Sequence, residues 1–458
     1  MRKPVIIALL FVALHAAGQK KWSVEDCMRY AIEHNHEVRK SQLALDNYVE
    51  SRTAAVGSFL PSLNASIGTQ YNFGRAIDPE TNTYTNVSTF SNGYSVYASI
   101  PVFDGFGKIH ALKAAKADVL MGKNALQVQR DQTALAVFQA YIDVLYYQQT
   151  LKMAEEKQAE ADLIVRQAKV MEEVGRMSNA DVSQTESSLA EAEYEVTRQQ
   201  NLLSSAMLTL KNEMNYAEEG ELVLVERGEI SGERGERREE REYQNRVSSN
   251  LKPSETATFN VQRSTFNVQI PQLNQAYFAQ QSALHQLREA RSALYPSIYF
   301  GAGVNTSYYK TLHSHTAESY RHQLKNNMGE YISATISIPI FNRLKTITAI
   351  RKARNNYLIA QKEYEQKRTE LEKLTMEAAQ DLSGYIKEAE KCERKVAADS
   401  IAYALTKRQF EEGLSTAIDL KTASSALINS RAELLKSRLM IVIKERLLNY
   451  YKGDALLD

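Results

Sequence analysis

The chain has 458 residues, with 56 Lys and Arg against 55 Asp and Glu, so its formal net charge is +1. That balance excludes a nucleic-acid binder that depends on a basic field. With only 19 glycines and 8 prolines a turn-dense all-β fold is excluded, and the two cysteines, Cys27 and Cys392, are too few for a disulfide framework or a cysteine-based zinc site. A mostly helical protein is predicted.

Residues 1–18 have the pattern of a secretory signal peptide. Arg2 and Lys3 are followed by an apolar run from Val5 to Leu14 and by small residues at 16–18. The run is too short to cross a bilayer as a helix, and no later stretch approaches about 18 consecutive apolar residues. We therefore expect an exported chain whose membrane insertion, if any, uses strands.

The mature sequence contains an internal duplication. Ser99–Phe103 (SIPVF) recurs as Ser337–Phe341 (SIPIF), and Gly175–Val182 recurs as Gly413–Leu420, both 238 residues later. Three such matches in one order, counting LPSL at 60–63 and YPSI at 295–298, indicate two copies of one unit. The predicted division is a first repeat at 19–216, an insertion at 217–270, a second repeat at 271–451 and a tail at 452–458.

Both repeats have the same predicted elements in the same order. An opening helix (24–58 and 271–294) is followed by a strand (62–72 and 297–307), a polar loop and a second strand (94–103 and 331–341). A long helix without proline (107–173 and 344–412), a turn containing glycine, and a shorter return helix (180–214 and 417–450) complete each repeat. The first long helix, with 67 residues, would reach about 100 Å.

The strands alternate apolar with small polar residues, as in Val96, Ala98 and Ile100 against Ser95 and Ser99. Segments of about ten such residues are typical of transmembrane β-strands around a water-filled lumen. A soluble sheet with one buried face is the alternative. Four inserted strands would leave two open edges in lipid, so closure requires several chains. Three chains would give twelve strands, which predicts a homotrimer.

The insertion breaks the repeat pattern. Residues 226–242 are a mixed Glu, Arg and Gly tract, and TFNVQ at 258–262 is repeated at 265–269. A tract of this composition cannot bury apolar surface and is predicted to be disordered. A binding collar is one interpretation, and a tolerated insertion is the favoured one.

With these motifs the sequence resembles the TolC-like outer-membrane efflux family over essentially the whole mature chain. The motifs are IPVF at 100–103, IPIF at 338–341 and G-x-x-S/T-x-x-D-V/L at both turns. The resemblance implies a mainly α protein with membrane β: a trimeric 12-stranded outer-membrane β-barrel continued by a periplasmic α-helical barrel of coiled-coil hairpins. The sequence departs from the family pattern in two places. The first helix of each repeat often has Asn-Pro-x-Leu in this family; the second repeat keeps Ile270-Pro271-Gln272-Leu273, but the first has Asn35-His36-Glu37-Val38. The long charged insertion at 217–270 is also atypical.

The function that the resemblance implies is a passive exit duct of a tripartite efflux pump or a type I secretion system. Its partners would be two further copies of the chain, a periplasmic adaptor, an inner-membrane pump and outer-membrane lipid. No enzyme activity, cofactor or metal is expected, and the exported substrate is not identified. A secreted coiled-coil scaffold or adhesin without a pore is the alternative from another class.

The two turns supply the candidate partner-binding residues. Gly175 and Gly413 suit a left-handed helix end, while Ser178 and Thr416 suit N-caps with an acid three residues later. Capping alone accounts for these residue types, and the resemblance adds docking of the adaptor. The full set is Gly175, Ser178, Asp181, Val182, Gly413, Thr416, Asp419 and Leu420.

Glu173 and Glu411 end the two outgoing helices, where an acid opposes the helix dipole. In one interpretation both glutamates are ordinary exposed helix residues without a specific role. An acidic ring of six carboxylates per trimer, acting as a cation-selective gate, is the other. His34 and His36 are two residues apart and do not face each other on a helix, and His313 and His315 are not predicted to bind metal. No residue pattern indicates a catalytic role.

Overall fold

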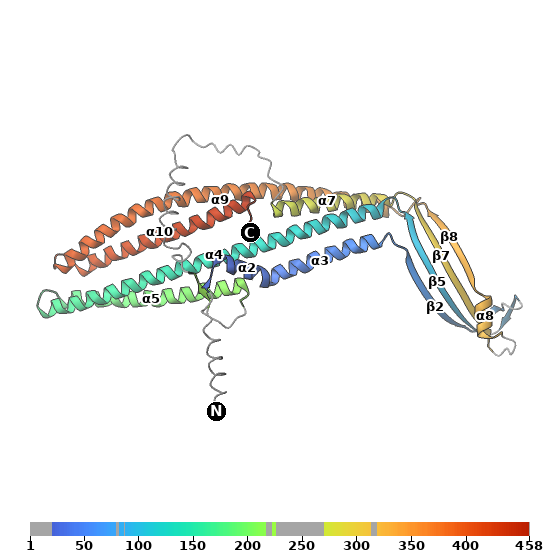
Figure 1. Cartoon of the computed structure of the whole chain (residues 1–458), viewed down its shortest axis with the longest axis horizontal. Helices are drawn as coiled ribbons and strands as arrows, with labels where there is room; N and C mark the ends of the chain where they lie inside the picture. The colour runs from blue at the N-terminus through green and yellow to red at the C-terminus, as the bar shows by residue number, and fades with distance from the viewer. Residues whose placement is uncertain are drawn as a thin grey trace, which may run out of the picture. The chain divides into compact units, whose positions relative to one another are not determined.

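The computed structural model describes residues 21–78, 82–86, 88–216, 222–225, 270–312 and 318–457 (Figure 1). Contacts divide the chain into two compact units. The helical unit comprises Met1–Gln42, Leu126–Pro271 and Arg368–Asp458, and the sheet unit comprises Leu43–Ala125 and Gln272–Lys367. The predicted signal peptide, His313, His315 and most of the insertion lie outside the described residues.

The sheet unit contains a four-stranded antiparallel sheet in the order β2-β5-β7-β8. The strands are β2 (Ser62–Asn72), β5 (Thr89–Phe103), β7 (Ser297–Thr311) and β8 (Gly329–Ser337). β5 and β7 extend beyond their predicted ranges, whereas β8 ends before the predicted residue 341. Pro339 lies just past its end, and proline cannot donate a hydrogen bond to a strand ladder. The central pair, β5 with β7, joins the first repeat to the second.

The register places apolar and polar residues in alternate rows across all four strands. Leu63, Ala98, Ala302 and Ile332 are direct neighbours in one row, and Ser62, Ser99, Gly301 and Ser333 form the next. The outer members of the apolar row, Leu63 and Ile332, are 74% and 86% exposed. The sheet therefore has one apolar face open to its surroundings and one polar, small-residue face, as the alternation predicts.

The described parts of the connections between the strands contain three short elements that the sequence did not predict. β3 (Arg75–Asp78) pairs with β4 (Thr83–Asn86), and α8 (Tyr320–Asn326) packs against β7. The Gln323 side chain accepts a hydrogen bond from the Tyr309 N–H and donates one to the Tyr309 carbonyl, both at 2.9 Å. It thus occupies the part of the β7 edge that β8 does not reach, which protects that edge from other strands.

The opening helix of the first repeat is two helices, which corrects the prediction of one helix over 24–58. α2 (Val24–His34) ends at Asn35, whose ψ of 132° is extended, and α3 (His36–Gly57) follows. The Asn35 side-chain oxygen accepts a hydrogen bond from the Glu37 N–H at 2.8 Å. Asn35 therefore ends one helix and caps the next. In the second repeat Pro271 is the first residue of α7 (Pro271–Ser292), a position where proline is favoured.

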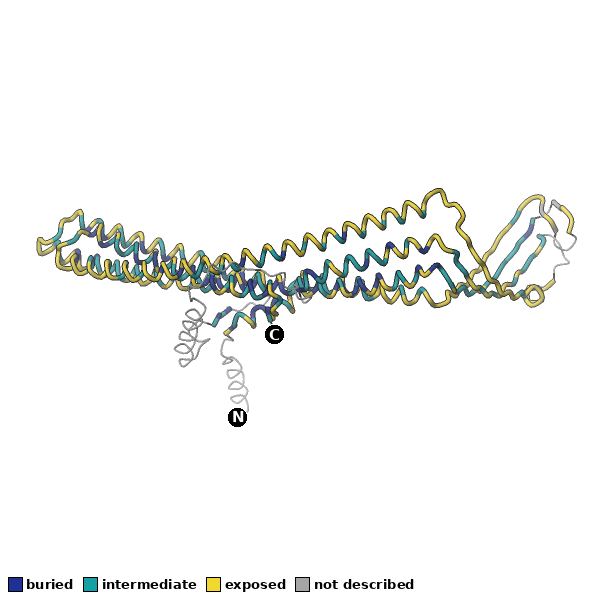
Figure 2. Tube along the Cα trace, turned by 90° about the horizontal axis from the view of Figure 1, so that it is seen from above, coloured by how far each residue is buried: buried dark blue, intermediate teal, exposed yellow. Residues whose placement is uncertain are grey.

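Two helical hairpins form most of the helical unit. α4 (Gly107–Glu173) is followed by α5 (Asn179–Met214), and α9 (Lys345–Glu411) by α10 (Ala417–Lys452). These bounds agree with the predicted helices to within two residues, because the uninterrupted helix formers fix them. Figure 2 shows buried residues running along the hairpins and exposed residues at both turns.

The largest core of the helical unit gathers residues from distant parts of the sequence. Its members include Trp22, Met28, Ala31, Val137, Tyr141, Val144, Leu210, Met214, Leu439 and Leu456. The Tyr141 hydroxyl donates to the carbonyl of Val225 at 3.2 Å, and burial raises the pKa of Tyr141 to about 12. Tyr141 therefore remains a neutral donor in this core at physiological pH.

Residues 222–225 of the insertion contribute to this core, ahead of the Glu/Arg/Gly tract at 226–242, which was predicted to be disordered and lies outside the described residues. β6 (Val223–Leu224) pairs in parallel with β1 (Lys21–Trp22), and Leu222 and Leu224 are buried. The short sequence Leu222-Val-Leu-Val225 is apolar and differs in composition from the Glu/Arg/Gly tract that follows it. Burial of these side chains offsets the entropy cost of ordering the segment. None of the helices in the described ranges is both long enough and apolar enough to cross a bilayer.

Candidate functional site

Both hairpin turns end their outgoing helix in the same way. At the first, the Gly175 N–H donates to the Glu172 carbonyl and the Arg176 N–H to the Met171 carbonyl, both at 2.8 Å. At the second, Gly413 donates to Phe410 at 2.9 Å and Leu414 to Gln409 at 2.7 Å. This is the Schellman arrangement, which requires a left-handed residue after the helix. The two glycines supply it with φ of 75° and 77°.

The returning helices begin with side-chain caps. The Asp181 N–H donates to the Ser178 hydroxyl, and the Asp419 N–H donates to the Thr416 hydroxyl, each at 3.2 Å. The second cap is a full capping box, because the Asp419 carboxylate also accepts from the Thr416 N–H at 3.1 Å. The predicted N-cap residues therefore occupy the expected positions, and hydrogen bonds within each turn satisfy backbone groups at the end of one helix and the start of the next.

The predicted tip residues differ in their accessibility. Val182 and Leu420 are only 6% and 3% exposed, so in the single chain they face inward. Leu420 packs with Phe410 and Ala417. The accessible apolar side chains at the turns are others: Val174 (65% exposed), Leu414 (76%) and Ile418 (60%). The internal duplication gives no signal for these three residues, because their counterparts 238 positions away are not apolar surface residues of the same kind: Val174 corresponds to Glu412, Leu414 to Arg176 and Ile418 to Ala180.

Glu173 and Glu411 are the last residues of α4 and α9, and both are exposed. They lie beside the turns, as predicted. Burial, followed by the hydrogen bond and charge of Glu160, raises the pKa of Tyr403, and the negative charge of Glu411 adds a smaller contribution.

Salt bridges join the two helical hairpins in the region next to their turns. Glu160 of α4 pairs with Lys407 of α9 at 2.5 Å, and Glu191 of α5 pairs with Lys421 of α10 at 2.6 Å. The bond from Lys421 lowers the pKa of Glu191, which keeps it ionised. A cavity of about 40 Å³ lies between these pairs, with Ile164, Thr185 and Leu420 in its lining. Motif spacing gives no signal for such pairs, because their members lie far apart in the sequence.

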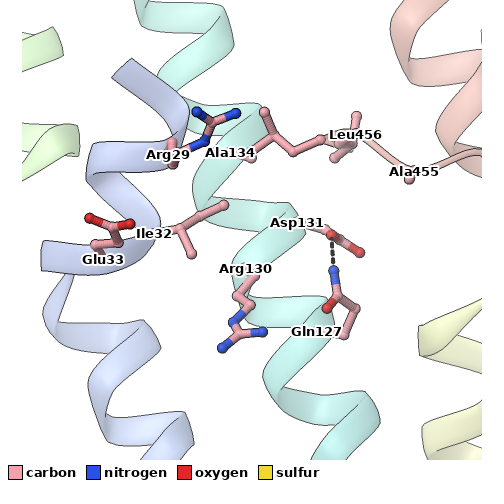
Figure 3. Close-up of a pocket in the computed structure, with 10 residues that line it drawn as sticks. Arg29, Ile32, Glu33, Gln127, Arg130, Asp131, Ala134, Ala455 and Leu456 are labelled. Atoms are coloured by element: carbon pink, nitrogen blue, oxygen red, sulfur yellow. Dashed lines mark hydrogen bonds between the residues drawn. The ribbon is translucent and has the colours of Figure 1, made fainter. Parts of the chain in front are cut away.

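A larger cavity of about 290 Å³ lies between α2, α4 and the residues after α10. Figure 3 shows Arg29 and Glu33 on α2, Asp131 and Arg130 on α4, and Leu456 at the far wall. Asp131 is 7% exposed, accepts a hydrogen bond from Gln127 at 2.8 Å, and has a pKa raised by burial. Within the described ranges no group of three His, Cys, Asp or Glu is placed to hold a metal ion.

The duplicated hairpins and the four-stranded sheet with an exposed apolar face define a two-repeat, mainly helical protein with membrane-type strands. The chain belongs to the outer membrane efflux protein family, whose model matches residues 28–215 and 264–452. It is therefore an efflux protein of the outer membrane. The expected fold class is confirmed.

Solved structures with the same fold include CusC, with a TM-score of 0.78, 15% sequence identity and 96% of each chain covered. The outer-membrane protein VceC of Vibrio cholerae matches with a TM-score of 0.74 and 14% sequence identity, and the match covers 94% of this chain and 96% of VceC. The CmeC channel of Campylobacter jejuni matches with a TM-score of 0.73 and 13% sequence identity, and the match covers 94% of this chain and 85% of CmeC. No curated protein sequence matches this one.

Proposed function

We propose that three copies of the chain form the exit duct of a tripartite pump or type I secretion system and conduct passively. The observation that carries this is the sheet with two open edges, β2 and β8. β8 is the second strand of its repeat, as β5 is, and β2 is the first, as β7 is. The β8 edge of one chain can therefore pair with β2 of the next as β5 pairs with β7, and this closes the ring in lipid.

The adaptor docks at the helical tips. The capped turns around Gly175 and Gly413 leave Val174, Leu414 and Ile418 exposed, and exposed apolar side chains beside a hydrogen-bonded turn suit a protein partner. Ser178, Asp181, Thr416 and Asp419 fix the shape of this surface, and Val182 and Leu420 support it from inside. The division into repeats 19–216 and 271–451 explains why each chain offers two such tips.

The closed state is held by the pairs between the hairpins. Breaking Glu160–Lys407 removes an attraction that both hairpins share, so the tips separate more easily. Glu173 and Glu411, exposed at the mouth, supply negative charge that favours cations. The exported substrate is selected by the pump and adaptor.

The test is purification from outer membranes in detergent, light scattering to count chains, and planar-bilayer recording of the same sample. Trimers that insert with a low conductance, raised in Lys407→Gln, support the proposal. Lys395→Gln is the matched control, because Lys395 pairs with Glu433 within a single hairpin. A soluble species that never inserts would support the scaffold or adhesin instead.

The gate residues have their own readout. Glu173→Gln with Glu411→Gln is expected to reduce the preference for cations in an asymmetric salt gradient. Glu193→Gln with Glu363→Gln neutralises two exposed carboxylates away from the turns and should leave the preference unchanged. Equal reversal potentials in wild type and the first variant would refute the acidic ring.

A further inference from the structure

Exposed cations gather where the two long helices leave the sheet. They are Lys113 and Lys116 on α4 and Arg351, Lys352 and Arg354 on α9, here called the basic collar. All five belong to the sheet unit, and none has an acidic partner among the described residues. Long cationic side chains without partners form an anion-binding surface.

The collar is present in both repeats. At the 238-residue offset, Lys113 corresponds to Arg351 and Lys116 to Arg354. Most surface positions of the two repeats differ, so a cation retained at two positions in both copies indicates a requirement shared by both helix starts. In a trimer these four positions would give a ring of twelve charges.

The charge is segregated rather than mixed. From Tyr331 to Lys362 the chain contains six Lys and Arg and no Asp or Glu, although the whole chain is balanced at 56 against 55. Lys345 is the first residue of α9, whose first turn has no acid. By contrast, α5 and α10 have Asp181 and Asp419 in their first turns. Lys345, in the first turn, opposes the helix dipole, so the start of α9 favours an external anion.

The collar lies directly beyond the apolar part of the sheet unit. Ile338, Ile340 and Phe341, which follow β8, are 64%, 94% and 77% exposed. Along α9, Arg351 lies about 9 Å and Arg354 about 14 Å past Lys345. Side chains on a helix lean toward its N-terminus, and Lys and Arg extend their charged ends toward an interface. These cations therefore reach back to the headgroup layer, which is about 5–8 Å deep on each side.

We propose that the basic collar binds the phosphate groups of anionic phospholipids in the periplasmic leaflet of the outer membrane. The inference rests on the proposed insertion of the sheet. Charge complementarity and continuity with the apolar face identify the partner as lipid: the apolar residues meet the acyl chains and the collar meets the phosphates. The lipid anions supply the charge that the start of α9 lacks, whereas at the start of α4 the Asp104 carboxylate accepts a hydrogen bond from the Lys108 N–H.

The test compares lipid selectivity in full-length protein reconstituted into vesicles of phosphatidylcholine with a minority of phosphatidylglycerol. Spin-labelled analogues of each lipid report which one is retained at the protein surface. Wild type should retain phosphatidylglycerol several-fold more than phosphatidylcholine at low salt, with the preference falling as NaCl is added. The variant K113Q/K116Q/R351Q/R354Q should lose the preference.

Two further proteins control for folding and general charge. K113R/K116R/R351K/R354K keeps the charges and should keep the preference. K152Q/K387Q/K391Q/K436Q removes four exposed cations of the helical unit and should behave as wild type. An unchanged preference in the collar variant would overturn the inference, as would inorganic phosphate displacing phosphatidylglycerol far better than NaCl of equal ionic strength. Failure to insert into either lipid would overturn the proposed function itself.

Discussion

Asp419 is bound more tightly than its counterpart Asp181. Its carboxylate accepts from the Thr416 hydroxyl at 2.7 Å and from the Thr416 N–H at 3.1 Å, whereas Asp181 accepts from the Ser178 hydroxyl at 2.7 Å. The bond from the Thr416 hydroxyl, followed by that from its backbone, lowers the pKa of Asp419 below the usual 3.8. The two tips are therefore capped with different strengths.

The first prediction concerns acid sensitivity at this cap. Because the folded pKa is lowered, the stabilisation is present above pH 3.8 and is lost as the pH falls from there through the folded value. Thermal unfolding of wild type and Asp419→Asn should differ near neutral pH and converge in acid. At neutral pH Thr416→Ala should cost about 1 kcal/mol. A constant difference across the acid range would contradict the assignment.

A second prediction involves His110 of α4 and His285 of α7. Their rings stack with centroids 5.8 Å apart, and both Nδ1 atoms are buried without a hydrogen bond. Burial, followed by the positive charge of Arg288, lowers the pKa of each histidine. The folded protein resists protonation, so stability should fall as the pH drops below 6.5, the value expected in the unfolded chain.

The double variant His110→Gln/His285→Gln should remove this loss. Melting temperatures measured between pH 7.5 and 5 would then decrease less than in wild type. His36→Gln is the control, since His36 is exposed at the start of α3. If both variants retain the same acid sensitivity as wild type, the pair is not its source.

At the scale of elements, the turn glycines and a mid-helix glycine respond in opposite directions. Gly413 has φ of 77° and Gly384 has helical backbone inside α9, and a Cβ at either would meet no atom within 4 Å. Gly413→Ala should therefore cost about 1–2 kcal/mol from backbone conformation alone. Gly384→Ala should stabilise α9 by about 0.5–1 kcal/mol. Denaturant unfolding tests both, and equal signs would exclude the conformational explanation.

The elements that sequence predicted best are those with a long, uniform signal. α4 follows from 67 residues without proline, and the alternation within each strand fixes which face is apolar. The helix break at Asn35 was not predicted, because there the Asn35 side-chain oxygen, and not a backbone carbonyl, accepts the hydrogen bond from the Glu37 N–H. β1 with β6 escaped because two short segments, distant in sequence, specify each other only through the shared core.

The candidate site was predicted to a similar extent. The repeated turn motif identified the caps at Ser178 and Thr416, since capping is local chemistry. It also suggested Val182 and Leu420 as contact residues, although packing between the hairpins buries both. The pairs Glu160–Lys407 and Glu191–Lys421 depend on how the hairpins meet, which no local pattern encodes.

For the whole molecule, the two faces of the sheet predict a difference between adjacent substitutions. Ile332 is on the apolar face near the middle of β8, and Ser333 is on the polar face. Arginine at 332 would meet hydrocarbon, at a cost of about 2–4 kcal/mol if it lies at the bilayer midplane. Ser333→Arg should cost far less. Urea titration of protein folded into vesicles measures both, and equal losses would exclude a lipid-facing row.

The core of the helical unit joins the two ends of the described chain. Trp22 and Leu456 belong to one buried cluster, and Arg446 donates a hydrogen bond to the Leu456 carbonyl. A chain that is secreted from its N-terminus exposes Trp22 long before Leu456 has crossed the inner membrane. In a chain translocated from its N-terminus the cluster can close only after Leu456 has followed Trp22, so this core is among the last parts of the protein to form.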